Sequence, residues 1–193
     1  MSNSHVILAA ATGAALALFS TAAIVAPAQA QEKTVTVGGA AMYPSKNIIQ
    51  NAVNSKDHTT LVAAVKAAGL VDTLSGNGPF TVFAPTNAAF AKLPAGTVET
   101  LVKPENKAML TKILTCHVVS ANAMSGAINK MIADDKGEHP VQTVGGCVLT
   151  AKKDGSKITL TDEKGGVATV TIADVRQSNG VIHVIDKVLL PAS

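Results

Sequence analysis

The stretch GPFTVFAPTNAAFAKLP, residues 78–94, contains the signals for a strand, a turn and a helix in direct succession. Residues 80–84 alternate with the two-residue period of a β-strand. Thr86 follows the strand and is a good N-cap for a short helix over residues 87–93. Pro94 then ends this helix. The stretch therefore predicts a strand that turns directly into a helix.

Apolar residues with helical spacing recur in three more segments, residues 45–55, 59–70 and 103–115. In the second segment Thr59 or Thr60 can cap the start of a helix, and Gly69 can end it. In the third, Pro104 lies near the first turn, where its missing N–H costs no hydrogen bond. These signals predict a largely helical first half of the domain.

The last third of the chain is rich in strand patterns. They cover residues 139–151, 156–162, 166–175 and 179–190, with turn signals at Asp154-Gly155, Lys164-Gly165-Gly166 and Ser178-Asn179-Gly180. The sequence between Val119 and Pro140 shows no regular pattern. Helices followed by antiparallel strands are typical of an α+β domain, and no repeat or linker divides the chain.

Residues 1–30 are small and apolar, carry no charged side chain and end in Ala28-Gln29-Ala30, as in a secretory signal peptide. Cleavage after Ala30 leaves a short N-terminal arm, residues 31–42, and one domain, residues 43–191. No later apolar run is long enough to span a membrane. We therefore expect no membrane span after cleavage and a protein secreted into a periplasm or outside the cell.

Composition argues against two classes of function. The formal net charge is only +3 and Arg176 is the one arginine, so nothing points to nucleic acid as a partner. The chain has no tryptophan, one tyrosine and four phenylalanines, which argues against an aromatic-lined sugar groove.

Both cysteines remain after cleavage, and one of them stands beside a histidine in LTCHVV, residues 114–119. In an oxidising compartment Cys116 and Cys147 predict a disulfide. A Cys–His pair can also form a nucleophile. If this segment is a strand, however, Cys116 and His117 point to opposite faces and cannot bond to each other. The pattern therefore favours the disulfide over catalysis.

No catalytic or metal-binding pattern emerges elsewhere. The histidines of the secreted chain are His58, His117, His139 and His183, and none of them is spaced to share a metal ion. The strand-turn-helix stretch lacks the G-x-S-x-G of a nucleophile elbow and the glycines of a phosphate loop. Asp134-Asp135 and Asp162-Glu163 are acidic neighbours that we expect in solvated turns.

Two segments closely resemble the signature blocks of the fasciclin domain family. They are residues 78–94, quoted above, and SNGVIHVIDKVLLP, residues 178–191. Between them ILTCHVV, residues 113–119, stands where the family has an aliphatic-tyrosine-histidine segment. Residues 47–74 also look like the opening helices of that domain. The resemblance runs from about Tyr43 to Pro191.

This resemblance implies an α+β, fasciclin-like fold in which an antiparallel β-wedge packs with a group of helices. It also implies a monomeric adhesion or interaction module without enzyme activity or cofactor, which binds a protein or a cell-surface or matrix partner. Two alternatives stay open: a binder of a small ligand, lipid or polysaccharide, and a cryptic hydrolase. A solvent-lined pocket that holds His117 or His183 with a carboxylate favours the hydrolase, whereas full burial of both histidines opposes it.

The resemblance also assigns roles to residues. Thr86 and Asn87 match the polar pair after the first signature strand, where we expect a cap and turn. His117 matches the central histidine, for which a buried ring with a backbone or hydroxyl partner is expected. The second block contributes Asn179, Gly180 and His183 as structural motif residues.

Two positions depart from the family pattern or bear on its partners. Cys116 replaces the family tyrosine, and a bridge to Cys147 would compensate for the lost phenol. Animal members are thought to contact receptors through two aspartate-isoleucine pairs. This chain has Lys112-Ile113 at the first and Asp174-Val175 at the second, so only Asp174 and Val175 are candidates for partner contact. The alternative is that Asp174 simply ends a strand.

Overall fold

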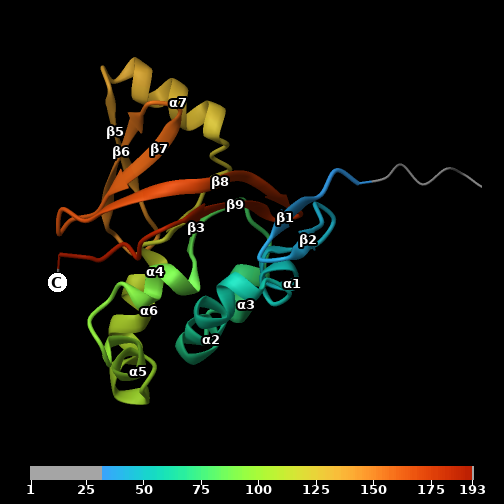
Figure 1. The fold of residues 1–193 in the computed structure, drawn as a ribbon, viewed down its shortest axis with the longest axis vertical. Coiled ribbons are helices and arrows are strands. Elements are labelled where there is room, and N and C mark those ends of the chain that lie inside the picture. Colours follow the sequence, from blue (N-terminus) through green and yellow to red (C-terminus); the bar gives the residue numbers. More distant parts are fainter. Residues whose placement is uncertain (1–31, 193) are drawn as a thin grey trace, which may run out of the picture. The chain divides into compact units, whose positions relative to one another are not determined.

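The structure is a computed structural model that describes residues 32–192. The expected signal peptide, residues 1–30, lies outside this part of the chain. A seven-stranded sheet runs in the order β4-β3-β9-β8-β7-β6-β5 (Figure 1). Its strands are β3 (Phe80–Pro85), β4 (Val118–Val119), β5 (Glu138–Gln142), β6 (Val148–Asp154), β7 (Lys157–Thr161), β8 (Val167–Gln177) and β9 (Gly180–Ile185).

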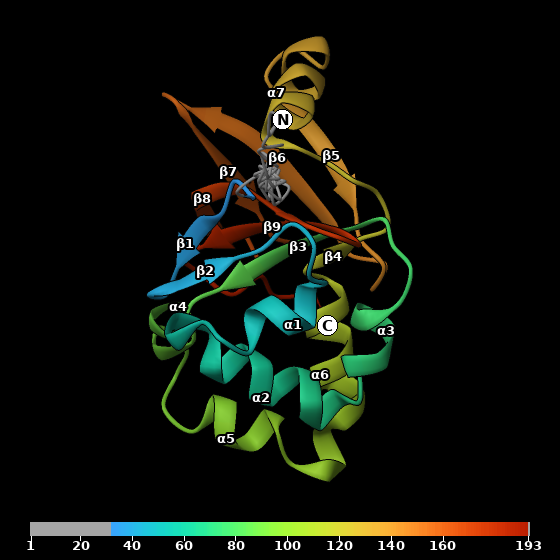
Figure 2. The same ribbon diagram turned by 90° about the vertical axis from the view of Figure 1, so that its right-hand side faces the viewer.

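The helices of the described part fall into two groups. The first contains α1 (Ile48–Ala52), α2 (Thr59–Ala68), α3 (Val71–Ser75), α4 (Asn87–Ala91), α5 (Thr97–Leu101) and α6 (Lys107–Thr115), with 3-10 turns at Lys56–His58 and Pro104–Asn106. The second is α7 (Ser125–Asp134) alone, which lies apart from the others beside β5 and β6 (Figure 2). The expected α+β class is confirmed.

Each helical group builds its own hydrophobic core with the sheet. The strand β3 serves both, because its side chains alternate as the sequence predicts. Val82 and Ala84 belong to the core under the first group of helices, whereas Phe83 belongs to the core under α7. Full burial of such side chains contributes roughly 1.5–3 kcal/mol each. The first signature stretch therefore joins the two halves of the domain.

The central strands β3 and β9 are paired in parallel, from Phe80 opposite Gly180 to Pro85 opposite Ile185. Every other pair in this sheet is antiparallel. The expected antiparallel wedge is therefore corrected at its centre. A Cβ atom on Gly180 would lie 1.9 Å from the Phe80 carbonyl oxygen, so only glycine permits this approach.

The polar pair Thr86 and Asn87 caps two helices. The Thr86 side chain accepts a hydrogen bond from the Ala89 N–H and caps α4. The Asn87 carbonyl oxygen accepts from the Thr60 N–H at 3.0 Å, and its amide donates to the Lys56 carbonyl at 2.9 Å. The start of α2 is thus capped by a residue distant in the sequence, and not by Thr59 or Thr60 as we expected.

Gly69 ends α2 in the left-handed conformation, as expected. Two expectations about residues 116–140 need correction. The irregular sequence before Pro140 contains the helix α7, which buries Ile128 and Ile132. Cys116 caps the end of α6 and His117 follows it, so the strand β4 begins only afterwards.

The stretch expected to be a short arm contains a two-stranded hairpin, β1 (Val35–Val37) and β2 (Ala40–Met42). Val37 and Met42 are buried in the first core. The hairpin therefore contributes apolar side chains to the packing of the domain.

Candidate functional site

Cys116 and Cys147 form the expected disulfide, with their Cα atoms 5.4 Å apart. Both residues are almost completely buried. The bridge joins the end of α6 to the residue before β6. A thiolate nucleophile is therefore absent from the Cys–His sequence.

His117 is 2% exposed, and backbone groups bind both of its ring nitrogens. The Nδ1 atom lies 2.8 Å from the Ile113 carbonyl, and Nε2 accepts from the Leu189 N–H at 2.9 Å. A carbonyl requires a donor and an N–H requires an acceptor, so these partners select the neutral Nδ1–H tautomer. Burial lowers the pKa of His117 to about 4, against the opposing effects of the Ile113 carbonyl and the Asp162 charge.

His183 is fully buried and bound in the reverse sense. Its Nε2 atom lies 2.8 Å from the Ala123 carbonyl, and its Nδ1 accepts from the Asp174 N–H at 3.3 Å. These partners select the Nε2–H tautomer. The ring stacks on Phe83 with 5.8 Å between centroids. Burial is the main cause that lowers the pKa of His183, against the Ala123 carbonyl and the Asp174 charge.

Asp174 has a positive φ of 59°, at an irregular point of the β8 pairing. Its carboxylate accepts hydrogen bonds from the Ser125 N–H at 2.6 Å and the Ser125 hydroxyl at 2.5 Å. Asp174 thereby fixes the first residue of α7 to the sheet. Val175 is 0% exposed, so its assignment as a partner contact is corrected: a fully buried side chain cannot reach a partner.

The amide of Asn179 connects β9 to two helices. Its oxygen accepts from the Ile48 N–H at 3.0 Å. Its nitrogen donates to the Leu74 carbonyl at 2.8 Å and the Gly76 carbonyl at 2.9 Å. Asn179 and the neighbouring Gly180 therefore fix the start of β9 against α1, α3 and β3.

The acidic pair Asp162 and Glu163 binds the end of the described chain. Asp162 accepts from the Leu190 N–H at 2.9 Å and is 6% exposed, so the expectation of a fully solvated turn is wrong for it. Glu163 accepts from the N–H groups of Ala192 and Val148, which lower the pKa of its carboxyl. Neither carboxylate faces a cleft as a general acid or base would.

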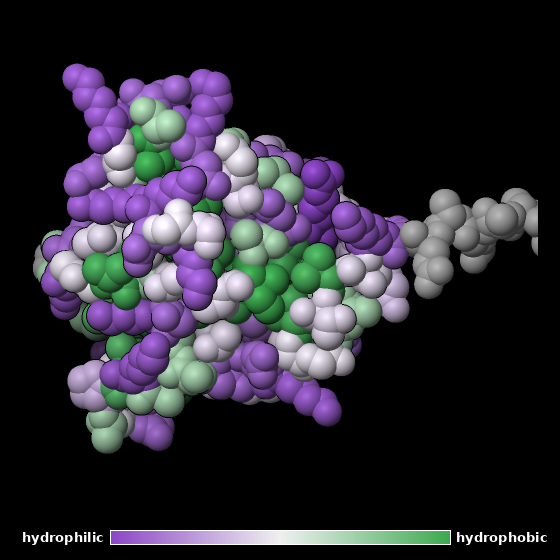
Figure 3. Space-filling view, turned by 45° about the horizontal axis from the view of Figure 1, so that its top comes forward, coloured by the Kyte–Doolittle hydropathy of each residue, from purple (hydrophilic) through white to green (hydrophobic). Residues whose placement is uncertain are grey.

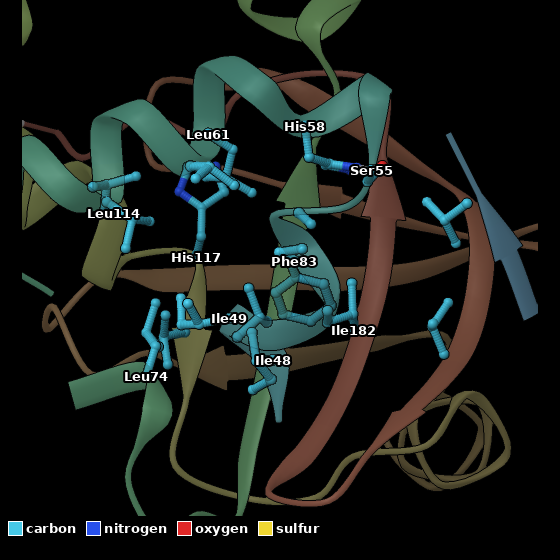
Figure 4. Close-up of a pocket in the computed structure, with 18 of the residues that line it drawn as sticks. Ile48, Ile49, Ser55, His58, Leu61, Leu74, Phe83, Leu114, His117 and Ile182 are labelled. Atoms are coloured by element: carbon cyan, nitrogen blue, oxygen red, sulfur yellow. Dashed lines mark hydrogen bonds between the residues drawn. The ribbon is translucent and has the colours of Figure 1, made fainter. Parts of the chain in front are cut away.

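An apolar cavity of about 40 Å³ lies between the first group of helices and the sheet (Figure 4). Its polar lining residues are Ser55, His58 and His117, and no carboxylate is among them. The Ser55 hydroxyl lies 2.9 Å from His58 Nδ1. No sequence pattern predicted this pair. Because Ser55 and His58 are 2% and 3% exposed, no substrate can reach them as a nucleophile and base.

A larger, open groove of about 670 Å³ lies between the hairpin β1–β2 and β8. Its lining includes apolar Val35, Met42 and Met124 and charged Lys33, Asp174 and Arg176. We call it the Asp174 groove. Figure 3 shows apolar surface bordered by hydrophilic side chains on one face of the described part. Such a mixture of an apolar centre and a charged rim is usual in protein interfaces.

Within residues 32–192, no group of three or more histidine, cysteine, aspartate or glutamate side chains is placed to hold a metal ion. In the same range, no helix has the length and apolar character needed to cross a bilayer.

The disulfide, the two buried histidines and the sheet with its two cores define an α+β scaffold, and comparison with known proteins identifies its family. The model of the fasciclin domain matches residues 56–191. The chain is 48% identical over 180 residues to protein sll1483 of Synechocystis sp., covering 93% of this chain and 92% of that protein. The chain therefore belongs to the fasciclin domain family.

Two further comparisons extend this result. The chain is 37% identical over 161 residues to the cell surface glycolipoprotein MPB83 of Mycobacterium bovis, covering 81% of this chain and 64% of that protein. The fold resembles that of a FAS1 domain pair from the insect cell adhesion molecule Fasciclin I, with a TM-score of 0.66 at 17% identity. That match covers 83% of this chain and 58% of the pair.

Proposed function

We propose that this protein is a secreted, non-enzymatic adhesion or interaction module that binds a protein or matrix component at the cell surface. Membership of the fasciclin family supports this proposal. So does the similarity to a mycobacterial protein named for its place at the cell surface, and to the fold of an insect cell adhesion molecule.

The observation that carries the proposal is the state of the two motif histidines. All four ring nitrogens of His117 and His183 have backbone partners, and neither ring is more than 2% exposed. A general base needs a nitrogen within hydrogen-bonding reach of a substrate. The hydrolase alternative therefore loses the residues on which it depended.

The lipid-binding alternative is opposed by volume. The apolar cavity measures about 40 Å³, well below the cavity of about 150 Å³ that is known to bind benzene. An acyl chain is larger than benzene and does not fit this cavity. We therefore place the interaction on the surface.

The Asp174 groove is the surface that suits this role best. Lys33 and Arg176 are exposed cations at its rim, and they outnumber the single negative charge of Asp174, whose carboxylate accepts hydrogen bonds from Ser125. The groove therefore offers positive charge around apolar side chains. A partner with carboxylates around an apolar contact would be electrostatically complementary.

The test is binding of the fluorescently labelled mature protein to the surface of the cells that secrete it. Arg176→Glu combined with Lys33→Glu should weaken this binding about tenfold, since both rim cations become repulsive. The matched control is Lys153→Glu, a charge reversal at an exposed position on β6. Equal binding by all three proteins would exclude the Asp174 groove as the contact surface.

A further inference from the structure

A third pocket lies between α7, β5 and the loop after β4, with a volume of about 170 Å³. Its floor is formed by Phe83, Ile128 and Leu160, none of which is more than 1% exposed. Exposed residues at its edge include Ala121, Pro140 and Gln142. It is thus a pocket with a dry apolar floor that opens to solvent. We call it the α7–β5 pocket.

Partly buried hydrogen bonds hold the walls of this pocket in place. The Thr81 hydroxyl donates to the Ala121 carbonyl at 2.6 Å and accepts from the Ala123 N–H at 2.8 Å. The Nε2–H of His183 donates to the Ala123 carbonyl. Asp174 fixes the first residue of α7 through Ser125. The motif residues His183 and Asp174 therefore preorganise one side of the α7–β5 pocket, which reduces the entropy lost on binding.

The size and lining of the α7–β5 pocket suit an aromatic ring. An engineered apolar cavity of about 150 Å³ is known to bind benzene, and this pocket is slightly larger. Met131 is only partly buried and offers a polarisable sulfur, which packs favourably with rings.

One polar side chain of the pocket, His139, can form a hydrogen bond that orients a ligand. His139 lines the pocket, and its Nδ1 lies 2.6 Å from the Asp135 carboxylate. Nδ1–H donates to that carboxylate, which leaves Nε2 as the ring nitrogen that can bind a ligand. A ligand hydroxyl suits this nitrogen because a hydroxyl can both donate and accept a hydrogen bond. A ligand carboxylate would be repelled by Asp135, and no lysine or arginine lines the pocket to offset that charge.

We propose that the α7–β5 pocket receives a phenol ring, presented as a tyrosine side chain by the protein partner. This inference rests on the proposed function, since it supplies the anchor residue of that interaction. A tyrosine buried in a preformed pocket is a common energetic hot spot of protein interfaces. The ring would pack against the partly exposed Met131 and Val141, above the buried floor, and its hydroxyl would form a hydrogen bond with His139 Nε2.

The first experiment uses N-acetyl-tyrosinamide as the probe and N-acetyl-phenylalaninamide as its matched control. Both are titrated into the full mature protein, and amide and methyl chemical shifts are followed by NMR. We expect saturable shifts at Phe83, Ile128, Met131 and His139, with the tyrosine probe binding about fivefold more tightly because of one hydrogen bond. Absence of saturable shifts at these residues, or equal binding of the two probes, would overturn the proposal.

Two variants test whether the probes bind in the α7–β5 pocket and whether His139 causes the preference for tyrosine. Ala123→Leu should fill the pocket and abolish probe binding. His139→Phe keeps a ring but removes Nε2, so it should bind both probes equally. NMR spectra of each variant check that the fold is retained. If Ala123→Leu proves unfolded, the His139→Phe comparison alone decides, and a retained preference for tyrosine would contradict the proposal.

Cell-surface binding of the same variants separates the tyrosine of a partner from a free phenol. We expect Ala123→Leu, if folded, to weaken surface binding about tenfold, and His139→Phe about fivefold. Full surface binding by a variant that no longer binds the probe would overturn the partner-tyrosine proposal. The adhesion function would survive that result as long as the two charge reversals in the Asp174 groove still reduce binding.

Discussion

His117 and His183 are both buried, neutral and bound on both nitrogens, yet they connect different parts of the molecule. His117 joins α6 to the segment after β9, inside the protein and beside the disulfide. His183 joins the irregular part of β8 to the loop that lines the α7–β5 pocket. The same chemistry therefore stabilises the interior in one place and shapes a surface in the other.

The difference predicts unequal costs of removal. Around His117 no solvent is available to replace a lost hydrogen bond, because its partners Ile113 and Leu189 are buried too. Around His183 the loop of Ala121 and Ala123 lies near the surface and can relax.

His117→Ala should reduce the free energy of unfolding by about 4 kcal/mol. The substitution leaves a cavity and deprives a buried carbonyl and a buried N–H of their partners. Urea unfolding measures the change, and His117→Gln is the control that retains one donor and one acceptor. A loss below about 1 kcal/mol for His117→Ala would show that this histidine does not hold the interior together.

Removal of the disulfide should cost slightly less. Cys116→Ser with Cys147→Ser frees a loop whose ends are 31 residues apart, and loop entropy then predicts a loss of about 3–4 kcal/mol. Hydrogen exchange should accelerate at residues 113–119 and remain unchanged at residues 121–125. Thiol labelling of the wild-type protein should find no reactive cysteine. Two labelled thiols would show that the disulfide between Cys116 and Cys147 is absent.

Acid should destabilise the protein through His117. Its pKa is 6.5 in the unfolded chain and about 4 in the folded protein, so the unfolded state binds the proton more tightly. The contribution of neutral His117 to the free energy of unfolding is therefore complete above pH 6.5. It is lost as the pH falls toward 4, by about 3 kcal/mol in total. Urea unfolding at several pH values measures it, and the loss should be smaller by that amount in His117→Gln.

His183→Ala should have the smallest effect on stability, about 2 kcal/mol, but the largest on the pocket. The loop at Ala121 and Ala123 should exchange its amide hydrogens faster, and N-acetyl-tyrosinamide should bind more weakly. Hydrogen exchange followed by mass spectrometry, with His117→Gln as the comparison, tests this. If hydrogen exchange in the loop accelerated equally in His183→Ala and His117→Gln, His183 would not be the histidine that holds this loop.

Local sequence patterns were sufficient where local interactions decide the structure. Thr86 caps the helix that follows it, and Gly69 ends α2, because each position acts within a few residues of itself. The alternation along β3 was readable because both of its faces are buried, each in a different core.

The features that the sequence did not predict depend on contacts between residues that are far apart in the chain. The parallel pairing of β3 with β9 joins residues about a hundred positions apart, and neither strand contains a signal of direction. Asn87 caps α2 from another helix, and no local rule predicts such a cap. The helix α7 buries only Ile128 and Ile132, among residues that are exposed or partly exposed, so it was missed, and the α7–β5 pocket with it.

Both motif histidines are neutral structural groups in opposite tautomers. Long-range ¹H–¹⁵N spectra of the histidine rings, recorded from pH 7.5 down to pH 5, show directly which ring nitrogen carries the proton. We predict a proton on Nδ1 of His117 and on Nε2 of His183, with His117 remaining neutral throughout this range. Titration of His117 near pH 6.5, or the opposite tautomer at either ring, would contradict the account.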